Sequence, residues 1–289
     1  MMGSLRILDG GLFTTIQDSG RTGFRKYGIP TSGAMDFQSY ELANWLVGNT
    51  KNSPLLELTL RGGRFKFESD AVIAITGALV NSKINDSKVR MNSSLRVKRD
   101  DEIELGFASR GCRSYIAIRG GLKVEKVMGS YSTYTIGKFG GFEGRSLQSG
   151  DVLEWEDMGL HFELREAQKE QIPYFSSKVR VRISKGPEWN WIYKGTQKKF
   201  LNSKFSISSK SNRMGIRLEG VLLENTNQKM ISSPVIPGII QLPPNGNPII
   251  LLQDGQTIGG YPRIAKVLDE DLWRLGQLKP GDNLGFILI

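Results

Sequence analysis

The residues best suited to chemistry begin in a glycine-rich stretch between residues 13 and 49. Asp18 and Arg21 flank a glycine there. An arginine can bind a carboxylate or phosphate through paired hydrogen bonds, and a nearby aspartate can orient a substrate or act as a base. The same two side chains could instead form a local ion pair that stiffens the loop, and both interpretations stay open. Further candidates for substrate binding in this loop are Gly20, Ser32 and Gly33.

A second glycine-rich region spans residues 120–150 and shows neither helical nor strand periodicity. We therefore expect a long ordered loop, and such loops are often functional. Its hydroxyl groups could donate to a developing oxyanion, while its glycines would allow close approach of the backbone. A purely structural Ω-loop is the alternative. The candidates here are Ser132 and Arg145 for catalysis, and Ser130, Thr133 and Gly141 for substrate binding.

A third group of polar residues lies in the last third of the chain, between apolar segments. Arg213 and Arg217 border a predicted strand, and one of them is expected to reach a site. Polar groups between apolar strands need partners, so the rest could form either a pocket wall or a buried structural network. The substrate-binding candidates are Arg213, Gln241, Asp254, Gln256, Thr257 and Tyr261.

Two carboxylates have simpler expected roles. Asp36 precedes a predicted helix and is expected to cap it. Glu57 lies among apolar neighbours, so it should be a buried acid that either has a raised pKa or pairs with an arginine.

Several chemistries are disfavoured by composition. The chain has one histidine, His161, and one cysteine, Cys112, which argues against the usual zinc sites and against Ser-His-Asp or Cys-His catalysis. No G-x-x-x-x-G-K-[ST] loop, no G-x-G-x-x-G after a strand and no Ala-Met-Lys-Met biotin-attachment site is present. We therefore expect no metal site, no nucleotide-binding loop and no attached biotin on this chain.

The formal charge is +10, but the basic residues are scattered. A nucleic-acid-binding protein would usually show a denser basic stripe. We therefore expect no nucleic-acid partner, and the positive charge suits a small anionic substrate or an acidic protein. No apolar run reaches the roughly 18 residues that a membrane helix needs, and no signal peptide is visible. With a single cysteine, a cytoplasmic location is expected.

Short strand-like runs recur about every ten residues, which is typical of a barrel or sandwich. Separate strands are predicted for AVIAITG (71–77), EIELGF (102–107) and SYIAIRG (114–120), and Asn245-Gly246 is a turn signal between two apolar runs, typical of a hairpin. Only three helices are predicted, at 36–47, at 189–194 and in the segment DEDLWRLGQL. An internal repeat of a Gly-Asp turn before a strand, at 147–153 and 278–284, supports two similar β-barrel domains. A looser third copy lies at 99–107. With 158–177 as a candidate linker, the predicted domains are 5–157 and 178–289.

Four sets of segments together resemble a known family. They are QDSGR (17–21) with GIPTSGAMD (28–36); LANWLVGN (42–49); GSYST (129–133) with GGFEGR (140–145); and SNRMGIRL (211–218) with PG (237–238) and QDGQTIGGYP (253–262). This set resembles the family called the C subunit of 5-oxoprolinase, allophanate hydrolase subunit 2, or antagonist of the sporulation-kinase inhibitor. It is also similar to half of the carboxyltransferase region of urea carboxylase.

The resemblance implies a mainly β fold of two cyclophilin-like β-barrel domains with a few short helices. It implies a hydrolase that opens the cyclic amide 5-oxoproline to L-glutamate, with two partners, a KipI-like B subunit and an A subunit. The complex would use ATP, and this chain is expected to be inactive alone. The alternatives are a regulatory protein that sequesters an inhibitor of a histidine kinase, and a carboxyltransferase or allophanate hydrolase subunit for urea-like substrates.

Overall fold

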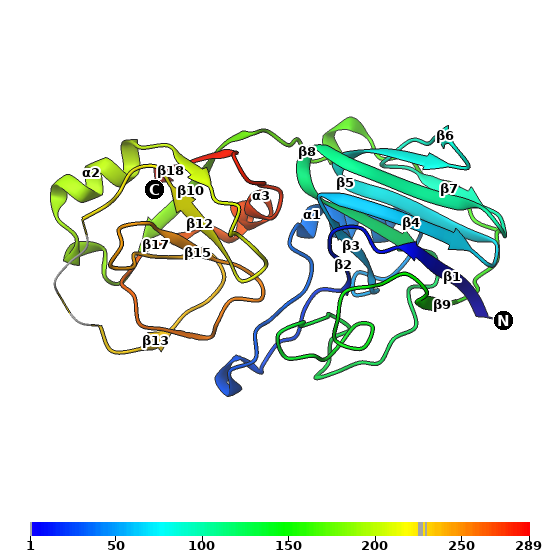
Figure 1. The fold of residues 1–289 in the computed structure, drawn as a ribbon, viewed down its shortest axis with the longest axis horizontal. Coiled ribbons are helices and arrows are strands. Elements are labelled where there is room, and N and C mark those ends of the chain that lie inside the picture. The colour runs from blue at the N-terminus through cyan, green and yellow to red at the C-terminus, as the bar shows by residue number, and fades with distance from the viewer. Residues whose placement is uncertain (1, 225–227, 229) are drawn as a thin grey trace. The chain divides into compact units, whose positions relative to one another are not determined.

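The computed structural model describes residues 2–224, 228 and 230–289. The chain forms two compact units (Figure 1). The first unit contains residues 1–21 and 32–175, and the second contains residues 22–31 and 176–289. The segment 22–31, which lies within the N-terminal domain predicted from sequence, is thus grouped with the second unit.

The first unit is built on a curled nine-stranded antiparallel sheet. Its central path runs β2 (Thr14–Gln17), β3 (Leu55–Thr59), β8 (Glu102–Ile118), β4 (Arg61–Phe67), β1 (Met2–Asp9) and β9 (Val152–Glu156). Strand β5 (Ala71–Ile84) pairs with β8, with β6 (Ser87–Lys88) and with β7 (Ser94–Val97).

Strands β5 and β8 are longer than the sequence predicted. The runs EIELGF and SYIAIRG, predicted as two strands, are parts of the single strand β8. The β5–β8 ladder is interrupted by register shifts just after Gly77, which has a φ of +83°. Bulges of this kind bend a long strand without ending it, so the change in pattern looked like a strand boundary.

Helix α1 (Phe37–Leu46) follows the opening loop and confirms the helix predicted over 36–47. Its first turn is capped by Asp36, which accepts hydrogen bonds from the backbone N–H and the hydroxyl of Ser39. The capping role predicted for Asp36 is confirmed. Tyr40 and Leu46 of the helix pack with buried residues of β5 and β8 in one core cluster.

The second unit is a closed seven-stranded barrel, in the order β10-β17-β14-β15-β12-β11-β18. The strands are β10 (Lys178–Lys185), β11 (Phe205–Ile207), β12 (Gly215–Glu219), β14 (Ile239–Gln241), β15 (Ile249–Leu251), β17 (Arg263–Val267) and β18 (Asn283–Leu288). The pair β10–β18 is parallel and the other barrel pairs are antiparallel. A small ribbon joins β13 (Ser233–Pro234) to β16 (Ile258–Gly259). Stacked rings of Phe200 and Phe286 lie in the core.

The helices of the second unit match the predictions unevenly. Helix α3 (Leu272–Gly276) lies in the predicted segment DEDLWRLGQL. The helix predicted at 189–194 is wrong in position: Trp189–Trp191 form a 3-10 turn, and α2 spans Lys194–Asn202. Only Thr196 and Phe200 of α2 are buried, so it has little apolar periodicity to detect. The turn signal Asn245-Gly246 does join β14 to β15 as a hairpin.

The repeated Gly-Asp turn has one geometry at all three predicted places. In each, an aspartate carboxylate accepts the backbone N–H three residues before it: Asp151 from Gln148, Asp282 from Lys279, and Asp101 from Lys98. The residue before the aspartate has a positive φ in each copy, namely Gly150, Gly281 and Asp100. The repeat is therefore a shared structural turn.

Part of the predicted linker belongs to the first unit. Leu160 and Phe162 pack against the α1 cluster, and the backbone N–H of Arg165 donates to Ser94 Oγ at 2.6 Å. Residues 160–167 are therefore packed structure, not a linker.

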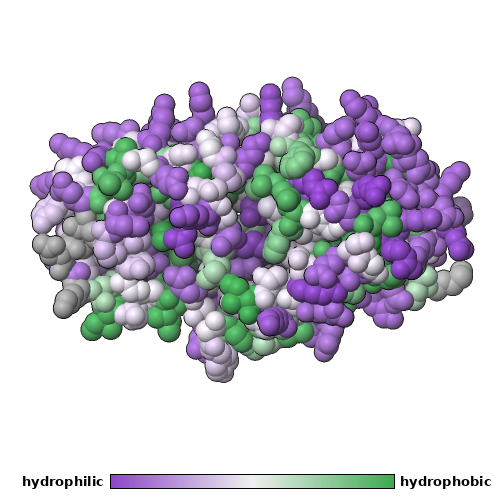
Figure 2. Space-filling view, viewed as in Figure 1, coloured by the Kyte–Doolittle hydropathy of each residue, from purple (hydrophilic) through white to green (hydrophobic). Residues whose placement is uncertain are grey.

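The prediction of a mainly β fold with a few short helices is confirmed. Among the described residues, no helix has the length and apolar character needed to cross a bilayer. Hydrophilic residues cover much of the face seen in Figure 2, with apolar residues in separate groups among them.

Candidate functional site

Asp18 is the centre of a buried hydrogen-bond cluster in the first unit. Its carboxylate accepts from the backbone N–H groups of Gly20 and Tyr131, both at 2.7 Å, and from the hydroxyls of Ser130, at 2.6 Å, and Ser132. These four donors come from both glycine-rich loops, so Asp18 ties the opening loop to the loop at 120–150. A carboxylate with this many donors is well suited to positioning its neighbours.

Arg21 is 1% exposed and lies beside the same cluster. Its guanidinium donates to the carbonyl of Ser132 and lies 5.0 Å from the centre of the Phe139 ring. A Cβ on Gly140 would lie 2.2 Å from that carbonyl oxygen and 3.0 Å from Arg21 Nη2. Glycine at 140 therefore makes room for the buried cation.

Ser32, in the opening loop, combines a buried hydroxyl with an uncommon backbone conformation. Its Oγ is buried and has no hydrogen-bond partner within the described part of the chain. Its φ of +53° is uncommon for a residue with a side chain. A backbone in a sparsely populated conformation together with an unfilled buried hydroxyl is typical of ligand-binding positions.

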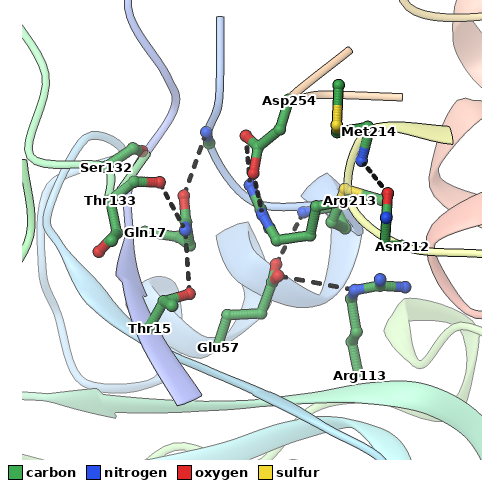
Figure 3. A network of polar contacts seen from close by, with 12 residues as sticks. Thr15, Gln17, Glu57, Arg113, Ser132, Thr133, Asn212, Arg213, Met214 and Asp254 are labelled. Carbon is green, nitrogen blue, oxygen red and sulfur yellow. Dashed lines mark hydrogen bonds and ion pairs between the residues drawn. The ribbon is translucent and has the colours of Figure 1, made fainter. Parts of the chain in front are cut away.

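Gly33 and Gln17 hold the Ser32 segment in place. Gln17 Oε1 accepts from Gly33 N–H at 3.2 Å, and Gln17 Nε2 donates to Thr15 Oγ1 and to the carbonyl of Thr133 (Figure 3). A Cβ on Gly33 would lie 2.9 Å from the backbone nitrogen of Gly20. The two predicted glycines therefore meet backbone to backbone.

Glu57 supports the residues that follow Ser32. It accepts from Met35 N–H at 2.8 Å and from the Tyr115 hydroxyl at 2.9 Å. It also pairs with Arg113 at 3.6 Å (Figure 3). The interpretation of Glu57 as a buried acid paired with an arginine is confirmed. Burial, with the nearby Glu57 and Asp36 carboxylates, raises the pKa of Tyr115 well above its ordinary value.

The remaining candidates in the long loop have structural contacts. Thr133 Oγ1 donates to the carbonyl of Ile16 at 2.9 Å. A Cβ on Gly141 would lie 1.9 Å from that oxygen atom of the threonine. The guanidinium of Arg145 forms a two-pronged pair with Asp151 at 2.7 and 2.8 Å, which lowers the pKa of that carboxyl group. The structure thus places Arg145 at the repeated turn, while its catalytic role stays a prediction.

In the second unit, two predicted residues form a buried ion pair. Arg213 Nε donates to Asp254 Oδ2 at 2.7 Å, and Arg213 Nη2 donates to Oδ1 at 3.2 Å (Figure 3). Both residues are buried, and Asp254 N–H also donates to the carbonyl of Arg213. This double connection holds the guanidinium in one orientation.

A second polar group in that unit surrounds Gln241. Its Nε2 donates to the carbonyl of Tyr261 at 3.3 Å, and its Oε1 accepts from Gln256 Nε2 at 3.4 Å. Thr257, the residue after Gln256, is buried, and its backbone carbonyl accepts a hydrogen bond from Val235 N–H. Arg25, from the segment 22–31, donates to the carbonyls of Val235 and Gln256, and burial lowers its pKa.

The sequence of this chain matches a known protein family. The family model described as "Carboxyltransferase domain, subdomain A and B" matches residues 27–288. This chain belongs to that family.

Relatives of this carboxyltransferase-domain chain include 5-oxoprolinase C subunits and urea amidolyases. The 5-oxoprolinase C subunit of Escherichia coli is 39% identical over 98% of this chain and 90% of its own length. The urea amidolyase of Saccharomyces cerevisiae is 34% identical over 96% of this chain, which spans only 16% of that protein. The crystal structure of the Kluyveromyces lactis urea carboxylase superposes with a TM-score of 0.95 at 34% identity, over 99% of this chain and 27% of that one. The resemblance drawn from the four sets of segments is confirmed.

Some residues of this carboxyltransferase-domain site were missed by sequence reasoning. Gln17 stands next to Asp18 in the first motif, and its position at the end of a short strand was the available signal. Tyr115, Phe139 and Arg25 gave no signal, because their partners are far away in the sequence. Within the described residues, no cluster of three or more His, Cys, Asp or Glu side chains could hold a metal ion.

Proposed function

We propose that this chain is the C subunit of an ATP-dependent 5-oxoprolinase, which opens 5-oxoproline to L-glutamate together with its A and B subunits. The observation that carries the proposal is the match to the Escherichia coli 5-oxoprolinase C subunit, which spans nearly all of both chains. The 5-oxoprolinase C subunit of Haemophilus influenzae matches in the same way, at 35% identity over 97% of this chain and 89% of its own length. The urea amidolyases, by contrast, correspond to this chain over a small part of their length.

The reaction adds water across the C–N bond of a five-membered lactam, so that the ring nitrogen becomes the amine of glutamate and the carbonyl becomes its side-chain carboxylate. A lactam is a poor electrophile, and we expect ATP to drive activation of its carbonyl by phosphorylation or carboxylation before water adds. Negative charge then develops on the former carbonyl oxygen, where a preorganised donor is most effective.

The geometry suggests distinct roles for the residues of the first unit. Ser32 Oγ lies in the opening loop, on a backbone with positive φ, and has no hydrogen-bond partner among the described residues, so it is the group we assign to the substrate. Arg21 contributes positive charge suited to the carboxylate of 5-oxoproline. Asp18 holds the two loops in register through its hydrogen bonds to Ser130 and Ser132. Arg213 and Asp254 form the corresponding fixed pair of the second unit.

The proposal places ATP use and part of the site on the partner subunits. This chain has no P-loop and no biotin-attachment motif. We therefore assign nucleotide chemistry to the assembled cytoplasmic complex, with no activity for the isolated chain.

A second candidate is a carboxyltransferase acting on urea-like substrates. It is favoured by the family description and by the close superposition on urea carboxylase. In that reaction the same donor would stabilise the oxyanion formed as a carboxyl group moves to a urea nitrogen.

The deciding experiment measures glutamate release from 5-oxoproline with ATP, using this chain alone and then with its co-encoded partner subunits. Release is expected only in the full mixture. The Arg21→Lys variant keeps the charge but loses the planar fork, so its KM for 5-oxoproline should rise while the complex still assembles. Arg99→Ala, which changes an exposed arginine, is the control.

Absence of release in every mixture, with the partners still bound, would overturn the 5-oxoprolinase proposal. Carboxylation of urea by the same mixture, supplied with a biotin carboxylase and carboxylated biotin, would then establish the second candidate.

A further inference from the structure

A cavity of about 480 Å³ lies in the second unit, between strands β10 and β18 and the end of helix α2. Figure 1 shows α2, β10 and β18 in the same part of that unit. This volume is within the range of small-molecule pockets. None of the candidate residues described above lines the cavity.

The charged residues described in the cavity wall are all basic. Lys178 and Arg180 of β10 and Lys204, just after α2, line it, and no aspartate or glutamate does among the described residues of the wall. Asp282, which immediately precedes β18, is buried and accepts a hydrogen bond from the backbone N–H of Lys279. Three like charges around one concave surface, without acidic neighbours in the wall, create a local positive potential that attracts anions.

The strand register explains why these groups converge. In the parallel pair β10–β18, Lys178 is opposite Asn283 and Arg180 is opposite Gly285. Val181 and Phe286 are buried in the barrel core, so the alternating residues Arg180 and Gly285 lie on the outer face. Arg180 donates from Nη2 to the carbonyl of Phe286 at 3.2 Å, which orients its guanidinium along the wall.

Gly285 opens the cavity. A Cβ at this position would lie 3.5 Å from Arg180 Cγ and 3.8 Å from the carbonyl oxygen of Ser203. A larger side chain would therefore fill the space between the strand and the end of α2. The wall also contains Leu201, near the end of α2, which is half-buried and offers apolar surface beside the cations.

We propose that this cavity binds a small organic dianion, either a dicarboxylate or a phosphate ester, whose charged groups meet Lys178, Arg180 and Lys204 and whose carbon skeleton lies on Leu201. An arginine guanidinium binds carboxylate and phosphate groups in the same paired geometry, so both ligand classes share this recognition chemistry. The proposal is independent of the proposed function, because none of its residues belongs to the site of the first unit.

The alternative is that the three cations only complement the carbonyl groups at the C-terminal end of α2. That role would affect the stability of the helix but would not produce saturable anion binding. The experiment must therefore measure binding and stability separately.

The test uses the full chain and isothermal titration calorimetry with glutarate, glycerol 3-phosphate and inorganic phosphate. We expect saturable one-site binding of at least one of the two organic dianions, weakening as salt is raised. The triple variant Lys178→Ala, Arg180→Ala, Lys204→Ala should lower its affinity at least tenfold. The matched triple variant Lys185→Ala, Lys194→Ala, Lys210→Ala removes the same charge from exposed positions and should bind as the original does.

Gly285→Leu provides the decisive variant, because it fills the cavity without removing a charge. Loss of binding in this variant, with an unchanged circular dichroism spectrum, supports the cavity as the binding site. A preference between glutarate and glycerol 3-phosphate shows whether the ligand is a dicarboxylate or a phosphate ester. The proposal is overturned by the absence of saturable binding with either organic dianion, by binding equal to that of inorganic phosphate, or by full binding in Gly285→Leu.

Discussion

At the scale of single residues, Ser32 of the first unit has a buried hydroxyl that makes no hydrogen bond to any described residue. Ser32 has a buried Oγ without a described partner and a left-handed backbone, whereas the hydroxyls of Ser130, Ser132 and Thr133 all donate to groups within the unit. The serines and the threonine predicted together from sequence therefore divide into one available donor and three structural ones.

Ser32→Ala should separate activity from stability. Removing an unfilled hydroxyl should leave the free energy of unfolding unchanged or raise it by about 1 kcal/mol. If Ser32 meets the developing oxyanion, kcat of the assembled enzyme should fall by roughly 100-fold. Steady-state kinetics and urea unfolding of the same preparation check both parts.

Ser130→Ala is the contrasting variant, because it removes a donor from the buried Asp18 carboxylate and should lower stability. Ser209→Ala, at an exposed position, should change neither quantity. Unchanged kcat in Ser32→Ala would exclude Ser32 as a substrate contact.

Gly141 should tolerate no side chain. An alanine Cβ would lie 1.9 Å from Thr133 Oγ1, so the threonine must leave its bond to the carbonyl of Ile16. We expect Gly141→Ala to lower the free energy of unfolding by about 1–3 kcal/mol. Gly129→Ala, in the same loop, also has a positive φ but nothing within 4 Å of the new Cβ, so it should cost less. Equal losses in urea unfolding would show that backbone strain alone acts at both positions.

The Glu188–Arg263 pair should make stability depend on pH. Arg263, on β17, donates from Nε and Nη2 to the Glu188 carboxylate at 2.9 and 2.8 Å, and these hydrogen bonds hold the pKa of Glu188 below its ordinary value. A lowered folded-state pKa adds stability above the unfolded-state pKa of about 4.3, and that stability is lost as pH falls through the folded-state value. From about pH 5 down to pH 2, the original chain should therefore lose more stability than Glu188→Gln. Urea unfolding at a series of pH values checks this, and parallel curves would contradict it.

At the scale of elements, one turn is used three times to begin a strand. In the copies at Asp151, Asp282 and Asp101, a carboxylate closes the turn and a preceding residue adopts a positive φ. The Asp151 copy also holds Arg145, and so links the end of the long loop to β9.

Asp282→Ala should weaken the barrel more than Asp282→Asn does. Alanine removes the acceptor for Lys279 N–H and leaves a buried turn unclosed, at a cost of about 1–3 kcal/mol. Asparagine keeps an acceptor oxygen at that place. Thermal and urea unfolding of the two variants check the order, and equal destabilisation would indicate that the charge matters more than the hydrogen bond.

At the scale of the whole molecule, the chain corresponds nearly end to end to 5-oxoprolinase C subunits but to a small part of the urea amidolyases. The same pair of units thus serves as a separate chain in one set of proteins and as a segment of a longer chain in the other. We therefore expect the reaction that these two units support to depend on the partner subunits or further domains that accompany them.

The isolated chain should therefore neither hydrolyse ATP nor release glutamate from 5-oxoproline. Both activities should be present once its partner subunits are added. A coupled ADP assay and chromatography of glutamate measure the two products. Glutamate release by the purified chain alone would contradict the assignment of nucleotide chemistry to the partners.

The sequence by itself determined what depends on local pattern. Alternation and turn residues predicted the mainly β fold, Asp36 as a helix cap, the hairpin at Asn245-Gly246 and the repeated Gly-Asp turn, because each rests on contacts within a few residues. The motifs also predicted the family and the two loops that meet at Asp18.

Only the tertiary structure decided which polar side chains already have hydrogen-bond partners within the protein. Asp18 and Ser132 bond each other across 114 positions of sequence, and Tyr115 reaches Glu57 across 58. The grouping of residues 22–31 with the second unit and the cavity lined by Lys178, Arg180 and Lys204 also depend on distant segments meeting. Hydrogen-bond satisfaction and burial are properties of the packed chain, and residue types alone do not reveal them.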